Sequence, residues 1–207
     1  MKELTTKQYN VIIGLVLLWG FIVNIATCVF FSELISSWSL ITVLIVYIIM
    51  ALTGASVGIK SDNPILNFLG YNLIVVPLGA VLSIFLRDYN TASIVQTIAT
   101  AALLTLLMIL ISSIKPQIFN SLGTTLLICL TCVIVVEFLM LFIGISSPYW
   151  WDKIVSLLFC MFIGFDWSKS QERRKTASNA IISAISLYLD IINLFLRLFG
   201  NEKRCDK

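Results

Sequence analysis

The chain alternates long apolar runs with short polar breaks from one end to the other. A transmembrane helix needs roughly 17–25 mainly apolar residues to cross a hydrocarbon core of about 30 Å. None of the runs has the two-residue alternation of a strand, and backbone groups in lipid must be hydrogen-bonded within their own segment. We therefore predict seven helical spans: Tyr9–Phe31, Trp38–Ile59, Ile65–Leu86, Ile94–Ile114, Ser121–Ile145, Trp151–Trp167 and Ala177–Phe199.

The composition fits a polytopic membrane protein and no soluble domain. Of the 207 residues, 59% are hydrophobic and 12% are charged, well outside the usual range for a soluble chain. The spans leave no length for a separate soluble unit, so we predict one all-α membrane domain over residues 1–207, with the lipid bilayer as its partner. The first span is too long for the apolar part of a cleavable signal peptide. The net charge of +3 is spread over loops and gives no reason to expect a nucleic-acid partner.

The basic residues separate by side of the membrane. Seven spans put eight of them on the side of the N-terminus: Lys2, Lys7, Lys60, Lys115, Lys169, Arg173, Arg174 and Lys175. The opposite loops carry only Arg87 and Lys153, so the positive-inside rule predicts a cytoplasmic N-terminus. The C-terminal tail, with Lys203, Arg204 and Lys207, would then lie outside, against the rule, and the sequence leaves its side open.

Two aspartates interrupt the last two spans. Asp166 and Asp190 are 24 residues apart, and a carboxyl group inside a bilayer costs several kcal/mol, about 2.5–3.5 on insertion scales. The polar residues Lys175–Asn179 predict the turn between these spans, and residue 178 is the midpoint of the two aspartates. Equal distance from the turn of a hairpin means equal depth, so we predict that the two carboxyls meet.

A polar stripe accompanies Asp190 on the last span. Its members recur every three or four residues and share one helix face: Ser183, Ser186, Asp190, Asn193 and Arg197. Ser186, Tyr188 and Asn193 are candidate supporting residues of an ion path. We expect the Arg197 side chain to snorkel to the outer interface. Glu137, deep in the fifth span, is either a further cation ligand or proton acceptor on that path, or a group that is protonated or hydrogen-bonded to a neighbouring helix.

The chemistry of the aspartate pair favours a pH-dependent cation gate. Two poorly hydrated carboxylates do not readily ionise together, and they titrate as a unit. With one proton they share a hydrogen bond; doubly ionised, they repel each other and attract a cation, for which Asp166 and Asp190 would be transient ligands. One alternative is a hydrogen bond that only locks the two helices.

An enzymatic alternative and a metal site are disfavoured. Intramembrane aspartyl proteases typically carry Gly-x-Gly-Asp, whereas Ser186-Leu187-Tyr188-Leu189 precedes Asp190 here, so we expect no enzyme. Cys129-x-x-Cys132 has a metal-like spacing, but the chain has no histidine and no second such pair. We therefore expect packing cysteines and no cofactor.

Residues 184–200, AISLYLDIINLFLRLFG, closely resemble the C-terminal signature of the Bax inhibitor-1 family. Phe165-Asp166 resembles that family's Tyr-Asp at the end of the sixth span. The resemblance implies a seven-helix bundle with the last helix near its centre. It also implies a pH-sensitive calcium leak gated by two aspartates, which carry over to Asp166 and Asp190.

The resemblance is less complete elsewhere. The family has a basic residue near the inner end of the second span, for which Lys60 is the nearest match; lysine lacks the bidentate fork of arginine. Residues 167–170, Trp-Ser-Lys-Ser, depart from the family's Thr-Gln-like continuation. A non-transporting membrane regulator of protein quality control or of cell-death signalling stays as the alternative function.

Overall fold

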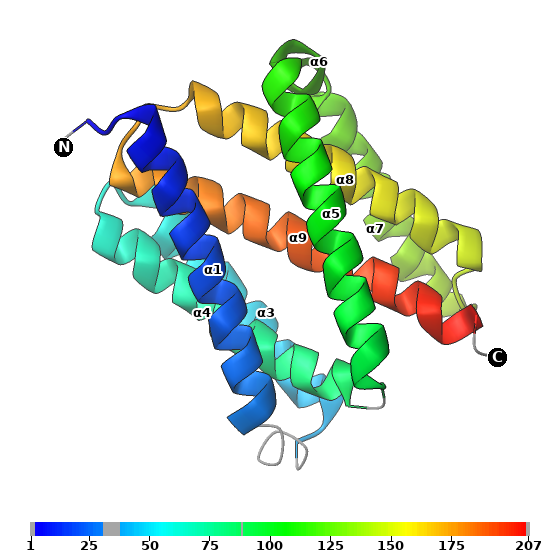
Figure 1. Cartoon of the computed structure of the whole chain (residues 1–207). Helices are drawn as coiled ribbons and strands as arrows, with labels where there is room; N and C mark the ends of the chain where they lie inside the picture. Colours follow the sequence, from blue (N-terminus) through cyan, green and yellow to red (C-terminus); the bar gives the residue numbers. More distant parts are fainter. Residues whose placement is uncertain (1–2, 31–37, 88, 206–207) are drawn as a thin grey trace. The chain divides into compact units, whose positions relative to one another are not determined.

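All regular secondary structure in the described part of the chain is helical. The computed structural model describes residues 3–30, 38–87 and 89–205; Lys2, Phe31 and Lys207 lie outside these ranges, and so do the side chains of Lys203 and Arg204. The helices, drawn in Figure 1, are α1 (Thr6–Phe30), α3 (Leu40–Lys60), α4 (Pro64–Leu86), α5 (Thr91–Ile114), α6 (Pro116–Ser121), α7 (Gly123–Ile143), α8 (Tyr149–Glu172) and α9 (Ala177–Cys205).

Polar residues in the breaks fix where helices begin and end. Asn63 accepts a hydrogen bond from the backbone nitrogen of Ile65 at 3.0 Å, and Pro64 opens α4. Asn90 caps α5 in the same way, through the nitrogen of Ala92 at 2.6 Å. These side chains satisfy backbone donors that the first helical turn leaves free. Gly144 ends α7 at a φ of 78°, which a residue without a Cβ adopts at little cost.

Six of these helices have the length and composition of membrane spans: Thr6–Phe30, Ile41–Lys60, Pro64–Leu86, Thr91–Ile114, Gly123–Ile143 and Ala177–Gly200. They correspond to six of the seven predicted spans. The remaining one, α8, is a helix of 24 residues that is not among these six candidates, and it contains Asp152, Lys153, Asp166 and Lys169. Among the six, the α9 span is the most buried.

One predicted boundary was wrong. The span expected from Ser121 is preceded by the short helix α6, because Pro116 is favoured at a first helical position, where its missing N–H is not needed. The last helix begins at Ala177, the predicted start of the seventh span, and the turn before it, expected at residues 175–179, is residues 173–176. Thr176 explains this start: its hydroxyl accepts the backbone nitrogen of Asn179 at 3.2 Å and caps the helix.

The chain forms two compact units. The first contains α1, α3, α4 and the part of α9 that ends at Tyr188; the second contains α5 to α8 and the part of α9 that begins at Leu189. Both candidate aspartates, Asp166 and Asp190, therefore belong to the second unit.

The first unit is built around a glycine seam between α3 and α4. Gly54 and Gly58 lie one turn apart on α3, a spacing that lets helices in lipid approach closely. A Cβ on Gly54 would lie 2.6 Å from the carbonyl oxygen of Gly70, and one on Gly70 would lie 2.5 Å from the backbone of Gly58. Packing of α3 against α4 thus requires glycine at positions 54 and 70, whereas a Cβ on Gly58 would come no closer than 3.2 Å to its neighbours.

Asparagines tie the helices of this unit together. Asn67 on α4 donates to the carbonyl of Gly58 at 2.5 Å and accepts from Ser178 of α9 at 2.5 Å. The Asn72 side chain accepts from the Trp19 indole of α1 at 3.0 Å. Such bonds add specificity where the surrounding lipid supplies no hydrophobic driving force between helices.

The glycine seam generates a stability prediction. Gly70→Ala should destabilise the protein by about 1–3 kcal/mol, the usual cost of forcing an extra methyl group into a packed interface. Gly14→Ala is the matched control, since a Cβ there has no neighbour within 4 Å. Thermal unfolding in detergent, followed by circular dichroism, measures both. Equal melting temperatures for the two variants would contradict this account of the seam.

Candidate functional site

Hydrogen bonds from α5 hold the stretch of α8 that carries Asp166. Ser112 donates to the carbonyl oxygen of Gly164 at 2.5 Å, and the indole of Trp167 donates to Ser113 at 2.8 Å. These contacts fix the backbone on both sides of Asp166.

Two aromatic rings pack this part of α8 against its neighbours, one from α6 and one from α8 itself. A Cβ on Gly164 would lie 2.3 Å from the ring of Phe119 in α6, and one on Gly123 of α7 would lie 2.6 Å from the ring of Phe165. Both glycines are therefore required by close ring packing. Together with the two hydrogen bonds, this packing gives the Asp166 side chain a defined direction.

The Asp166 carboxyl meets that of Asp190. Asp190 is buried, with 8% of the residue exposed, and it makes both a hydrogen bond and a charge contact with Asp166. A hydrogen bond between two carboxyls requires a proton on one of them. The Oδ2 atom of Asp190 is buried and has no hydrogen-bond partner within the described residues. Buried polar atoms in proteins are usually hydrogen-bonded, so this oxygen has acceptor capacity to spare.

The two aspartates lie together although the count that predicted their contact was wrong. Asp166 is six residues before the end of α8, whereas Asp190 is thirteen residues after the start of α9. The two helices therefore do not match the equal-register hairpin that we assumed. The contact depends on the packing around Asp166, which no count along the sequence includes.

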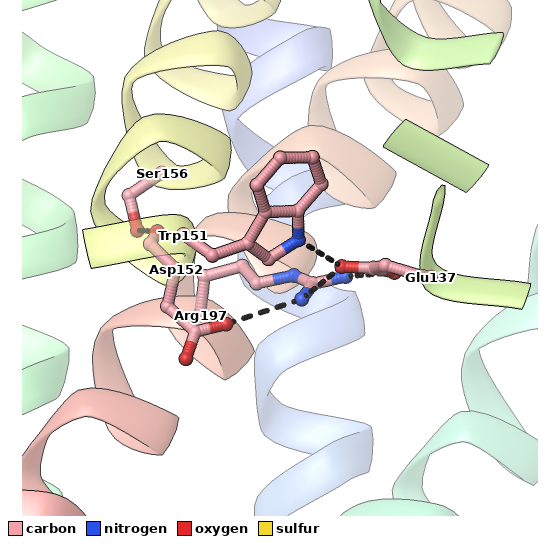
Figure 2. Close-up of polar contacts among 5 residues, drawn as sticks. All are labelled: Glu137, Trp151, Asp152, Ser156 and Arg197. Carbon is pink, nitrogen blue, oxygen red and sulfur yellow. Dashed lines mark hydrogen bonds and ion pairs between the residues drawn. The ribbon is translucent and has the colours of Figure 1, made fainter. Parts of the chain in front are cut away.

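A second charged cluster lies in the same unit, formed by Glu137 of α7, Asp152 of α8 and Arg197 of α9 (Figure 2). We call it the Arg197 cluster. The guanidinium forms a bidentate ion pair with Glu137, with Nη1 2.5 Å from Oε1 and Nη2 2.7 Å from Oε2. Its Nη1 also reaches Oδ1 of Asp152 at 3.3 Å. The indole of Trp151 donates to Glu137 at 3.2 Å.

The Arg197 cluster gives Arg197 and Glu137 partners. The Arg197 side chain is 27% exposed and ion-paired with two acids, which the sequence did not predict, and its place at the outer interface stays a prediction. Glu137 has the hydrogen-bonded role that was one of its two predicted alternatives, and its place on an ion path stays a prediction. One guanidinium between two carboxylates leaves a formal charge of −1, and Asp152 lies in the first turn of α8, where the helix dipole favours an anion.

Sequence reasoning missed Asp152. This residue follows Trp150 and Trp151, and paired tryptophans are typical of the aromatic belt at a membrane interface. It is 5% exposed, and its backbone oxygen accepts a hydrogen bond from Ser156 at 2.7 Å. The available signal was the stripe on the last helix, because an arginine seven residues after Asp190 falls on the same face and needs an acidic partner there.

Two of the other predicted residues, Asn193 and Tyr188, make hydrogen bonds with partners other than the aspartates. Asn193 donates to the backbone of Leu189, one turn back on its own helix, at 2.8 Å. Tyr188 belongs to the first unit, where it accepts a hydrogen bond from Asn24 at 2.7 Å. Ser186 and Lys60 are also in that unit; Ser186 is half-buried, and Lys60 is the exposed last residue of α3. Supporting roles for these residues stay predictions.

The shared hydrogen bond generates a prediction about pH and stability. Between the first and second ionisation of the pair, Asp166 and Asp190 share one proton; as the pH rises further that proton leaves and the two charges repel. The parent protein should therefore lose roughly 1–3 kcal/mol between about pH 5 and 8, the cost of leaving buried polar groups unpaired. Asp190→Asn keeps an amide donor for the Asp166 carboxylate and removes the second charge, so the repulsion that lowers the stability of the parent should be absent from it.

Thermal unfolding across this pH range tests the shared proton. Glu172→Gln is the control, because Glu172 is an exposed acid of the same helix, ion-paired with Lys169 at 3.0 Å. It should behave as the parent does. The same pH dependence in Asp190→Asn as in the parent would mean that other groups cause it.

The amino-acid sequence is similar to one protein family and to two curated plant proteins. Residues 1–200 match the family described as Inhibitor of apoptosis-promoting Bax1. Protein LIFEGUARD 3 of Arabidopsis thaliana is 30% identical over 137 residues, which are 64% of this chain and 55% of that protein. A BI1-like protein of the same plant is 33% identical over 86 residues, 41% of this chain and 33% of the relative. The matches thus span about half and a third of the length of these curated relatives.

Proposed function

The chain belongs to the Bax inhibitor-1 family of membrane proteins, and on that premise we propose that it is a pH-sensitive leak channel for cations. Asp166 and Asp190 form its gate, and calcium is the transported ion. The channel has no resident cofactor and no enzymatic activity.

One observation carries the proposal: a hydrogen-bonded carboxyl pair inside apolar helices, with the Oδ2 atom of Asp190 buried and unpartnered among the described residues. An ionisable group in a membrane bundle is costly, and a functional role is the first hypothesis for it. If the pair only locked two helices together, both carboxyls could have been replaced by neutral amides at lower cost. An oxygen with spare acceptor capacity supports binding of a proton or cation.

The mechanism follows from the charge of the pair. At acid pH the protons neutralise both aspartates, so they neither repel each other nor attract a cation. With one proton left, the hydrogen bond keeps the path closed. When that proton leaves, the two carboxylates repel, the path opens, and its lining is negative. Carboxylate oxygens are suitable ligands for calcium, which prefers hard oxygen donors.

The proposed topology has seven spans and a cytoplasmic N-terminus. Helix α8 joins the six candidate spans to make seven, and in chain order it is the sixth of them. It has 24 residues, which correspond to roughly 36 Å at 1.5 Å per residue, enough to cross a bilayer. Its polar composition is accommodated because Asp152 and Asp166 have partners inside the protein.

Calcium entry into liposomes tests the gate. The parent should leak more calcium as the pH rises between about 5 and 8, a window set by two carboxyls that resist joint ionisation. Asp166→Asn and Asp190→Asn keep size and some hydrogen bonding but remove one charge, so each should lose most of this pH response. Glu172→Gln is again the control and should keep it. A full parental pH profile in both Asn variants would rule out the gate.

Labelling of single cysteines tests the topology. In a background without the five native cysteines, Arg174→Cys should react from the cytoplasmic side and Thr91→Cys from the opposite side. Both positions are exposed and lie between helices or at a helix start. Reaction of both with an impermeant reagent from one side would overturn the seven-span assignment.

A regulator without transport is the second candidate function. It is favoured by the family's description as an inhibitor of apoptosis-promoting Bax1. Such a protein would act through contacts with other membrane proteins in quality control or cell-death signalling. If the parent protein carries no cation at any pH in liposomes, this function replaces the channel.

A further inference from the structure

We propose that Arg197 is a built-in counter-ion that latches α7 and α8 to α9, and that release of this latch increases the cation leak. The proposal rests on the channel function above, which it deepens by naming a second control point. Arg197 is a positioning and charge-setting residue in it, distinct from the aspartates of the gate.

The geometry of the Arg197 cluster is that of a clamp on three helices. Glu137 and Asp152 are 60 and 45 residues away from Arg197 in the sequence, yet one guanidinium contacts both. The two parallel contacts with Glu137 use the planar fork of arginine, which a lysine cannot reproduce. With Asp152 only 7% exposed at its side chain, solvent screens this part of the cluster weakly. Breaking the clamp therefore frees α7 and α8 from the same point of α9.

Arg197 and Asp190 are linked through their common helix. They are seven residues apart, so they share a face of α9 and are separated by roughly 10 Å along its axis. Both belong to the second unit. A displacement of α9 that the Arg197 cluster resists would therefore also move Asp190 against Asp166.

The positive charge of Arg197 also lowers the cation leak. Glu137 and Asp152 could attract a mobile cation, but the guanidinium is already bound to both. A tethered cation competes with a free one and adds positive potential near the pair. The two effects predict that loss of the guanidinium raises the leak, whereas loss of a cation-binding carboxylate on a path would lower it.

Calcium flux at one fixed pH distinguishes these possibilities. Arg197→Gln should raise the leak roughly fivefold, equivalent to about 1 kcal/mol of differential stability. Glu137→Gln should raise it as well, and the double variant should leak no more than the stronger single variant, because both substitutions break one interaction. Arg197→Lys keeps the charge without the fork and should fall between the parent and Arg197→Gln.

The control is Arg87→Gln, which removes one exposed positive charge in the other unit and should leave the leak at the parental level. A reduced leak in Glu137→Gln would make Glu137 a cation ligand and overturn the latch. Unchanged leak in both Arg197→Gln and Glu137→Gln would overturn it too.

Spin-label distances test the latch without relying on transport. Labels at Leu139 of α7 and Leu157 of α8, both more than half exposed, should give a narrow distance distribution in the parent. Arg197→Gln and Glu137→Gln should broaden it, and Arg87→Gln should not. Identical distributions in all four proteins would refute the latch. A parent without leak but with these changes would refute the channel and retain the latch.

Discussion

A carboxyl group in an apolar helix must find its hydrogen-bond partner inside the protein, because hydrocarbon offers none. This constraint organises the second unit of the molecule. Asp190 is bonded to Asp166, and Glu137 and Asp152 share Arg197. Helix α9 contributes one member to each group. The path of that helix through the unit is therefore set by polar contacts as well as by apolar packing.

The long helices were predictable because each contains an apolar run of membrane-spanning length, and such a run is hydrophobic whatever it packs against. The residues at which the helices begin and end were harder to predict. The start of α9 at Ala177 agrees with the prediction, but the hydroxyl of Thr176 that caps the helix there was not foreseen. The break between α6 and α7 at Leu122 has no glycine or proline at that residue to mark it. Helix ends are decided by single hydrogen bonds, which hydrophobic periodicity does not encode.

The candidate site was predictable in its chemistry and only partly in its partners. Asp166 and Asp190 stood out because a membrane segment carries such residues at a cost. Their contact, however, depends on Gly164 against Phe119 and on Ser112 and Ser113 of α5, which a count along a hairpin ignores. Arg197 looked like an interfacial residue because its acidic partners are 45 and 60 positions away. Long-range ion pairs of this kind need the fold before they can be assigned.

The central claim is that one proton held between Asp166 and Asp190 decides whether the path is closed. Infrared difference spectra of the protein in liposomes, recorded against Asp190→Asn, measure the protonated carboxyl directly through its carbonyl stretch. The account predicts a protonated carboxyl band that is present in the parent, is missing from the variant, and disappears with rising pH at the same midpoint at which calcium entry begins. A parent without such a band, or a band whose loss leaves calcium entry unchanged, would contradict it.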